Sequence, residues 1–99
     1  MKEIFFQQKE QRIFFVGDLT RETIDILFEQ KTLRLLSSSY IELDLEEVGR
    51  IDTAGLAWLL MMLEEAQRNS CQLALFRAPT NLMHLAKLSS VDCFLPIAQ

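Results

Sequence analysis

An alternating segment followed closely by a very apolar helix is the feature that most constrains how this chain can fold. Residues 40–45 alternate apolar with polar side chains, which is the pattern of a strand with one buried face. Asp52 and Thr53 then precede an apolar run at residues 54–63. Side-chain oxygens at such a junction accept the free amides of a first helical turn. The sequence therefore predicts a strand, a short turn and a helix that ends near Asn69, with Asp52 or Thr53 as its N-cap.

The N-terminal third predicts a hairpin and a first helix. Residues 4–6 and 13–16 are apolar and flank a polar stretch, which is typical of an antiparallel β-hairpin. Thr20 is suited to cap the helix that follows, with Glu22 in its first turn, where the helix dipole favours an acid. The apolar spacing of that helix predicts an inner face formed by Ile24, Leu27, Phe28 and Leu35.

The C-terminal third adds one more strand and one more helix. Residues 73–76 form a short apolar strand, and Pro79 suits the first turn of a final helix. The inner face of this helix is predicted to be Leu82, Leu85 and Ala86. Because strands joined through helices run parallel, the order β-β-α-β-α-β-α predicts an α/β fold. We expect a mixed four-stranded sheet covered by about three helices, in which only the N-terminal hairpin is antiparallel. Glu42 and Asp44 do not suit a strand that is covered on both faces.

The composition limits what the chain can bind. Its 99 residues predict one small domain, residues 1–99, with a single core. Ten Lys and Arg against fourteen Asp and Glu give a net charge of −4, and the scattered basic residues argue against nucleic-acid binding. The apolar run at residues 56–63 is shorter than the roughly 20 residues that cross a bilayer, and the N-terminus lacks a signal-peptide core. We therefore expect a cytoplasmic protein whose Cys71 and Cys93 are reduced thiols.

Catalytic and metal-binding residues are scarce in this sequence. His84 is the sole histidine, and with two distant cysteines it completes no zinc-ligand set. The sequence contains neither of the common glycine-rich phosphate-binding motifs. A nucleophile, a base and a group that orients them cannot be assembled from these residues. We therefore predict a protein that is not an enzyme and that uses no cofactor or metal.

The apolar helix after Asp52 has two apolar faces. One face carries Leu56, Leu59, Leu60 and Leu63, and it should pack on the sheet. The other face is apolar where a surface helix is normally polar, and a chain of this length has few elements to bury it. Trp and Met on that face are residue types that pack adaptably at protein interfaces. The predicted partner-binding residues are Asp52, Thr53, Ala54, Trp58, Met61, Met62 and Glu65.

Thr53 is also a candidate phosphorylation site. A phosphate there would lie at the positive end of the helix, so the helix would tolerate it. It would add about −1.5 to −2 units of charge beside Asp52 and the apolar surface, and so should weaken a partner contact.

Three segments follow one another in a recognisable order and spacing: residues 16–19, 41–45 and 52–56. Together they resemble the STAS domain family of sulfate-transporter tails and anti-sigma factor antagonists. The last resembles the signature D-[ST]-[SAG]-G-[LI], in which the hydroxyl after Asp is the family's phosphorylation position, here Thr53. The resemblance covers nearly the whole chain. It implies a STAS-like fold and a partner surface made of the phosphosite loop and the following helix, with Gly17 and Asp18 in the loop beside it.

Within the family, two details are similar to one branch, the small cytoplasmic STAS subunit of the Mla phospholipid-transport ABC complex. They are Thr53 at the phosphorylation position and residues 85–88 near Leu95-Pro96. This implies a non-catalytic subunit that supports the transporter's ATPase, reaches the inner membrane only through that partner, and helps to maintain outer-membrane lipid asymmetry. The main alternative is an anti-sigma factor antagonist whose Thr53 is phosphorylated by an anti-sigma kinase. A small enzyme or nucleotide-binding protein using the loops at Asp18 and Asp52 is a third.

Overall fold

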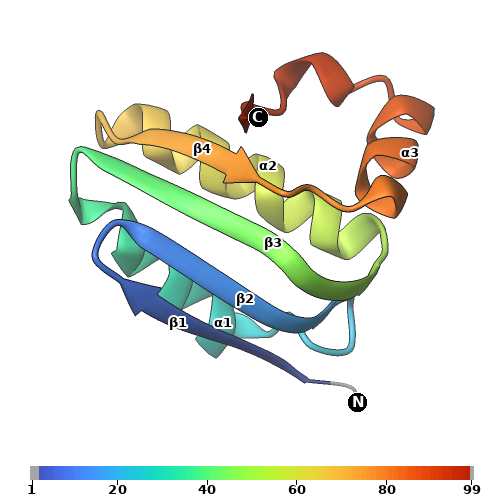
Figure 1. Ribbon diagram of the computed structural model, residues 1–99, viewed down its shortest axis with the longest axis horizontal. Coiled ribbons are helices and arrows are strands. Elements are labelled where there is room, and N and C mark those ends of the chain that lie inside the picture. The colour runs from blue at the N-terminus through green and yellow to red at the C-terminus, as the bar shows by residue number, and fades with distance from the viewer. Residues whose placement is uncertain (1–2, 99) are drawn as a thin grey trace.

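All the strands that the structure describes belong to one mixed sheet (Figure 1). The computed structural model describes residues 3–98. In chain order, the elements are β1 (Ile4–Lys9), β2 (Arg12–Leu19), α1 (Ile26–Leu33), β3 (Tyr40–Ile51), α2 (Thr53–Arg68), β4 (Gln72–Phe76), α3 (Thr80–Leu88) and β5 (Ile97–Ala98), with short 3₁₀ helices at Arg34–Ser37 and Asp92–Phe94. The strands lie in the order β1-β2-β3-β4-β5. β1 runs antiparallel to β2, and all other neighbours run parallel.

The predicted fold class is confirmed, although the described chain has five strands instead of four. The hairpin, the parallel remainder and the three α-helices are as predicted. The additional strand β5 pairs with the end of β4, and the Leu75 amide donates to the Pro96 carbonyl over 2.9 Å. A strand of two residues has no alternating pattern, so only the return of the chain along β4 creates it.

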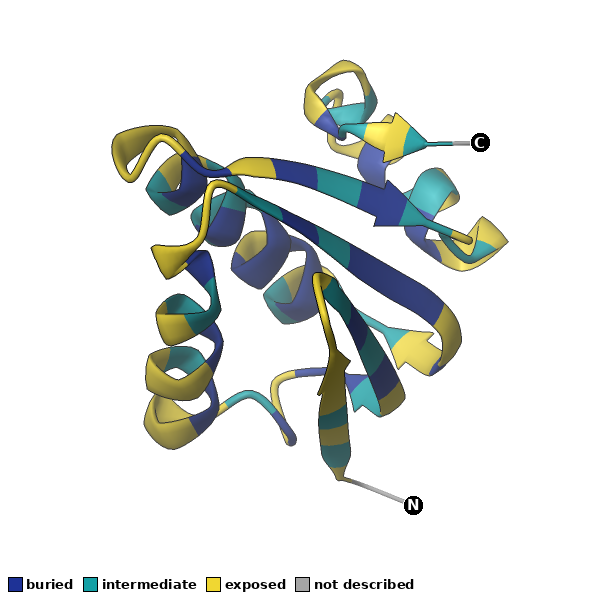
Figure 2. Ribbon diagram, turned by 60° about the vertical axis from the view of Figure 1, so that its left-hand side comes forward, coloured by how far each residue is buried: buried dark blue, intermediate teal, exposed yellow. Residues whose placement is uncertain are grey.

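The helices α1 and α2 pack against one face of the sheet, and burial alternates along the central strands accordingly (Figure 2). The covered face carries the core side chains of β2, β3 and β4. These are Ile13, Phe15, Ile41, Leu43, Leu45, Leu73 and Leu75. Both cysteines are free thiols, Cys71 buried and Cys93 exposed.

The opposite face explains why acids occur in a central strand. Glu42 and Asp44 point away from the core, because their neighbours in β3 are the fully buried residues. Arg12 Nε lies 2.9 Å from Glu42 Oε1, and Arg77 Nη2 lies 3.3 Å from Asp44 Oδ2. The Arg12 guanidinium also stacks over the Phe76 ring at 4.2 Å. Because α1 and α2 pack on the other face of the sheet (Figure 1), ion pairs with Arg12 and Arg77 accommodate the two acids on this face.

The first helix begins later than its apolar spacing predicts. Thr20 is not its N-cap, and Glu22 lies before the helix, because the Thr20 carbonyl instead closes a turn with the amides of Thr23 and Ile24. The helix starts after Asp25, whose Oδ1 accepts the Phe28 amide over 2.8 Å. Phe28 is buried as predicted, but Leu27 is 64% exposed, so its predicted place in the core is wrong.

Candidate functional site

The ends of β2 and β3 and the start of α3 are joined by hydrogen bonds close to the start of α2. Gly17 and Asp18 lie in β2, so their predicted place in a loop is wrong, and Asp18 accepts the Arg50 amide through Oδ1 over 3.0 Å. Asn81, at the start of α3, donates from Nδ2 to the Gly49 carbonyl over 2.9 Å. These contacts join residues that are far apart in sequence. They hold the end of β3, and so the Asp52–Thr53 junction, in a defined position.

Asp52 is the N-cap of α2 and also binds the loop after β2. Its Oδ1 accepts the amides of Ala54 and Gly55 over 2.9 and 3.2 Å, and its Oδ2 accepts the amide of Arg21 over 3.0 Å. Burial acts to raise the pKa of Asp52, but hydrogen bonds from these three amides and from its own backbone amide outweigh it and lower the pKa below its usual range. The Asp52 carboxylate therefore has a structural role, and it fixes the position of Thr53.

We expect Asp52→Asn to reduce the free energy of unfolding by about 1 kcal/mol near neutral pH, since its amide nitrogen cannot replace the second acceptor oxygen. The pKa of Asp52 is lower in the folded chain than in the unfolded one. Its stabilisation is therefore complete above an unfolded pKa of about 3.9 and is lost as the pH falls through the folded pKa. Urea unfolding near pH 7 and near pH 3 should show that the difference in free energy of unfolding between the wild type and Asp52→Asn becomes smaller in acid. A difference that is the same at both pH values would contradict this role.

Gly55 allows the start of α2 to lie directly against the end of β2. A Cβ atom at this position would lie 2.2 Å from the Leu19 carbonyl oxygen, which belongs to the backbone and cannot turn away. A second close approach occurs at Gly17, where φ is +120° and a Cβ atom would lie 2.1 Å from the Glu3 carbonyl oxygen. Both glycines therefore set the distances between the segments that form the site.

We expect Gly55→Ala to destabilise the fold by about 1–3 kcal/mol through this overlap. Helix propensity alone would favour alanine by about 1 kcal/mol, so a net loss reports the contact with Leu19. The urea midpoint should fall with an unchanged m-value. Ala57→Ser, at an exposed position of the same helix, is the matched control and should stay within about 0.5 kcal/mol of the parent. A stabilised Gly55→Ala variant would show that the two segments can separate freely.

Thr53 is the first residue of α2 and is exposed. Its hydroxyl makes no hydrogen bond with any residue in the described range 3–98 and is free to meet a partner or an enzyme. On either side of Thr53 in the chain, the Asp52 carboxylate accepts the amides of Ala54 and Gly55. Of the two predicted caps, Asp52 is therefore the N-cap of α2, and Thr53 is exposed at the surface beside it.

Trp58 and Met62 lie in the core, so their predicted exposure is wrong. They are 2% and 0% exposed, respectively. The Trp58 indole packs between Phe15 and Phe28, with ring centroids 5.4 and 5.3 Å away, and Nε1 donates to Thr32 Oγ1 over 3.1 Å. The reason is that α1 packs beside α2 and covers the face that the sequence pattern left without a neighbour. Neither side chain can contact a partner of the folded chain directly.

The other predicted residues of this face lie at intermediate depth. Ala54 and Met61 are partly buried, and Glu65, 30% exposed in its side chain, pairs with Arg68 over 2.9 Å. In the part of the chain that the structure describes, no cluster of three or more His, Cys, Asp or Glu side chains is placed to hold a metal ion. No described helix is long and apolar enough to cross a membrane.

The motif order, the sheet and the capped junction agree with one family of domains. A family model described as "Mlab, STAS domain" matches residues 5–96 of the chain. The chain belongs to the STAS domain family. No curated protein is significantly similar to it in sequence.

Solved structures share the fold of this STAS domain at low sequence identity. An anti-sigma factor antagonist from Mycobacterium paratuberculosis is 16% identical, with a TM-score of 0.69 over 95% of this chain and 82% of that one. SpoIIAA in its unphosphorylated form is 12% identical, with a TM-score of 0.67 over 97% and 88%. The phosphorylated form of the Bacillus cell fate determinant SpoIIAA is 11% identical, with a TM-score of 0.60 over 97% and 91%. At these identities the likeness concerns the fold alone.

The outer face of α2 in this STAS domain differs from the predicted one by a rotation about the helix axis. Starting at Thr53, the residues that face outward follow a spacing of three or four, which is one side of an α-helix. Ala57 is exposed, and Leu60 and Met61 are partly exposed. We call this surface the α2 outer stripe: Thr53, Ala57, Leu60, Met61 and Glu64. The sequence analysis did not include Ala57 and assigned Leu60 to the face on the sheet. A helical spacing of three or four residues counted from Thr53 would have predicted both on the outer face.

Proposed function

We propose that this STAS domain is a non-catalytic accessory subunit that binds and supports the ATPase of a phospholipid-transport ABC complex. The single observation that carries this proposal is the match to the "Mlab" family model over residues 5–96. STAS domains act as protein-interaction modules, and the α2 outer stripe offers a surface for that role. In this proposal the chain reaches the inner membrane only through its partner, and the complex maintains outer-membrane lipid asymmetry.

The α2 outer stripe would bind the ATPase through its apolar side chains, one of them small. Ala57 lets a partner approach the helix closely, and Leu60 and Met61 offer flexible apolar contacts beside it. The subunit would act by population shift, because binding can favour an assembled ATPase only as far as its affinity for that state exceeds its affinity for others. No group transfer by the chain is required.

Affinity purification of the tagged full chain from its native cells tests the proposal. A P-loop ATPase in stoichiometric amount, with permease subunits, is the expected partner. Addition of the purified chain to that ATPase should then raise the fraction that is assembled. Recovery of a sigma factor regulator in place of the ATPase would refute the transporter role.

The second candidate is an anti-sigma factor antagonist that is switched by phosphorylation of Thr53. The observation that favours it is the free, exposed Thr53 hydroxyl at the start of α2, on a fold shared with anti-sigma factor antagonists. A phosphate there would meet the Asp52 carboxylate and weaken binding along the stripe. Incubation with the captured partner and ATP should then add one phosphate to the wild type and none to Thr53→Ala. Unmodified wild type, with a kinase-fold partner present, would refute this switch.

A further inference from the structure

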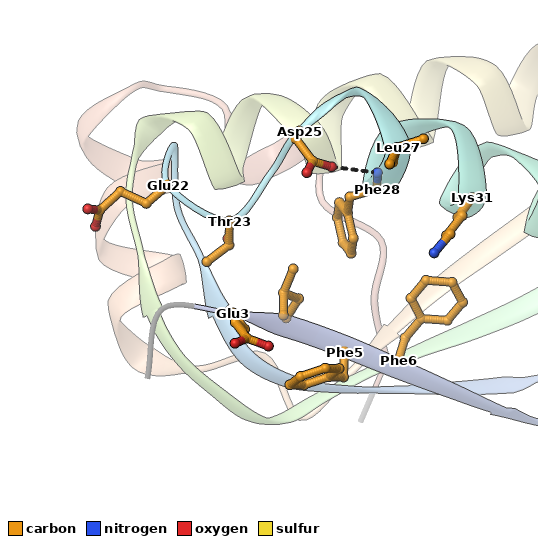
Figure 3. A pocket seen from close by; sticks show the side chains of 10 residues that line it. Glu3, Phe5, Phe6, Glu22, Thr23, Asp25, Leu27, Phe28 and Lys31 are labelled. Atoms are coloured by element: carbon orange, nitrogen blue, oxygen red, sulfur yellow. Dashed lines mark hydrogen bonds between the residues drawn. The ribbon is translucent and has the colours of Figure 1, made fainter.

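A hollow of about 480 Å³ lies between β1 and α1, and no residue of α2 lines it (Figure 3). Ile4 is one of the residues that line it. Figure 3 shows the Phe6 ring entering it from β1 and the Phe28 ring entering it from α1. The Phe6 and Phe28 rings meet edge to face, 6.2 Å apart, and both line the hollow. Leu27, 64% exposed, also lines it. This volume is in the range of ordinary ligand sites, and its centre is apolar.

The strand beside this hollow has a free hydrogen-bonding edge. β1 is the first strand in the sheet order and has only β2 as a neighbour within the described residues. The Glu3 carbonyl accepts the Asp18 amide across the hairpin over 3.1 Å, so the backbone of Glu3 faces β2. Hydrogen-bonding directions alternate along an antiparallel strand. The amides and carbonyls of Ile4, Phe6 and Gln8 therefore point outward, away from the sheet.

Side chains of opposite charge lie at opposite ends of the hollow. Glu3 and Asp25 lie at the end where β1 begins, whereas Lys31 points toward Phe6 from the other end (Figure 3). Lys31 makes no ion pair with the residues in the range 3–98 that the structure describes. An occupant should therefore carry positive charge at the first end, an apolar side chain in the middle and negative charge beside Lys31.

We propose that this groove binds an extended protein segment that adds a strand to β1. The segment is basic at the end beside Glu3 and Asp25, apolar over Phe6 and Phe28, and acidic, or a chain terminus, beside Lys31. Backbone hydrogen bonds to Ile4, Phe6 and Gln8 supply affinity, and the side-chain pattern supplies selectivity, as in other strand-addition complexes. The site is independent of the α2 outer stripe, so it allows a second contact by the same partner or by another one.

A phage-displayed library of random linear peptides, selected on the full chain, tests this site. Gln8→Pro removes one outward amide and obstructs an added strand, while the inward hydrogen bonds of β1 remain. Gln8→Thr keeps the amide and is the matched control, because both variants lose the Gln8 side-chain bond to the Glu10 carbonyl. The enriched peptide, made synthetically, should bind Gln8→Thr like the wild type and Gln8→Pro about tenfold or more weakly. Lys31→Glu should weaken it about two- to fivefold, and reversing the acidic residue of the peptide should restore binding.

Amide hydrogen exchange on the wild type gives a readout that does not depend on any variant. The peptide should slow exchange at Ile4, Phe6 and Gln8 and leave exchange at Ala57 unchanged. The proposal is overturned if no enriched peptide discriminates between the two Gln8 variants, or if protection falls on α2. It is also overturned if sedimentation shows a dimer that Gln8→Pro dissociates, since a second copy of the chain would then occupy the edge.

Discussion

Trp58→Ala is expected to lower the free energy of unfolding by about 3–5 kcal/mol, which is a large part of the stability of a small domain. The indole is 2% exposed and touches both Phe15 and Phe28. Its removal leaves a cavity where β2, α1 and α2 meet, and it deletes the hydrogen bond to Thr32. Urea unfolding of the isolated chain measures the loss directly.

Trp58→Phe is the matched variant for this prediction. It keeps an aromatic ring between the two phenylalanines and removes only the indole N–H and part of the volume. The Thr32 hydroxyl stays paired, because it also donates to the Phe28 carbonyl over 3.0 Å. We therefore expect a smaller loss, about 1–2 kcal/mol. If Trp58→Ala unfolded like the wild type but failed to bind its partner, Trp58 would belong to the interface after all.

Ala57→Arg should weaken binding to the captured partner by at least about 2 kcal/mol while the fold remains intact. Ala57 is exposed one turn after Thr53, with Leu60 and Met61 on the next turn. A long charged side chain there would hold a partner away from the helix and would be desolvated by any close contact. Titration of the partner by calorimetry or fluorescence measures the change.

Gln30→Arg is the control for that binding experiment. Gln30 is an exposed residue of α1, so the variant adds the same charge to another helix surface. It should bind the partner like the wild type, and both variants should unfold within about 0.5 kcal/mol of it. Equal binding by Ala57→Arg and the wild type would remove the α2 outer stripe from the interface.

The capped junction could be predicted from the sequence because its causes are local. Asp52 accepts amides from residues two and three positions later, Ala54 and Gly55, and such contacts require only a strand end followed by a helix start. The hairpin and the parallel strand order also follow from short patterns and from the geometry of crossovers. The exposed position of Thr53 beside this cap follows from the same local geometry.

The orientation of α2 could not be predicted in this way. Its sequence is apolar on most sides, so the pattern alone does not say which side meets the sheet. The contact of Trp58 with Thr32, a residue of α1, decides the rotation, and that contact joins positions 26 residues apart in the chain. The acids of β3 show the same limit, because their positions in a central strand depend on ion pairs with Arg12 and Arg77, which are distant in sequence.

By itself, the sequence determined the hairpin, the three helices, the parallel order of the central strands and a capped junction at residues 52–53, because these depend on neighbours within a turn or on the period of a strand. The structure assigned the cap to Asp52 and added β5. Only the tertiary structure decided which side chains remain exposed. It buried Trp58 and Met62, left the stripe from Thr53 to Met61 at the surface, and placed α1 beside a free strand edge. The physical reason is that the burial of an apolar side chain depends on which distant element packs against it, and that element is chosen by the fit of the whole core.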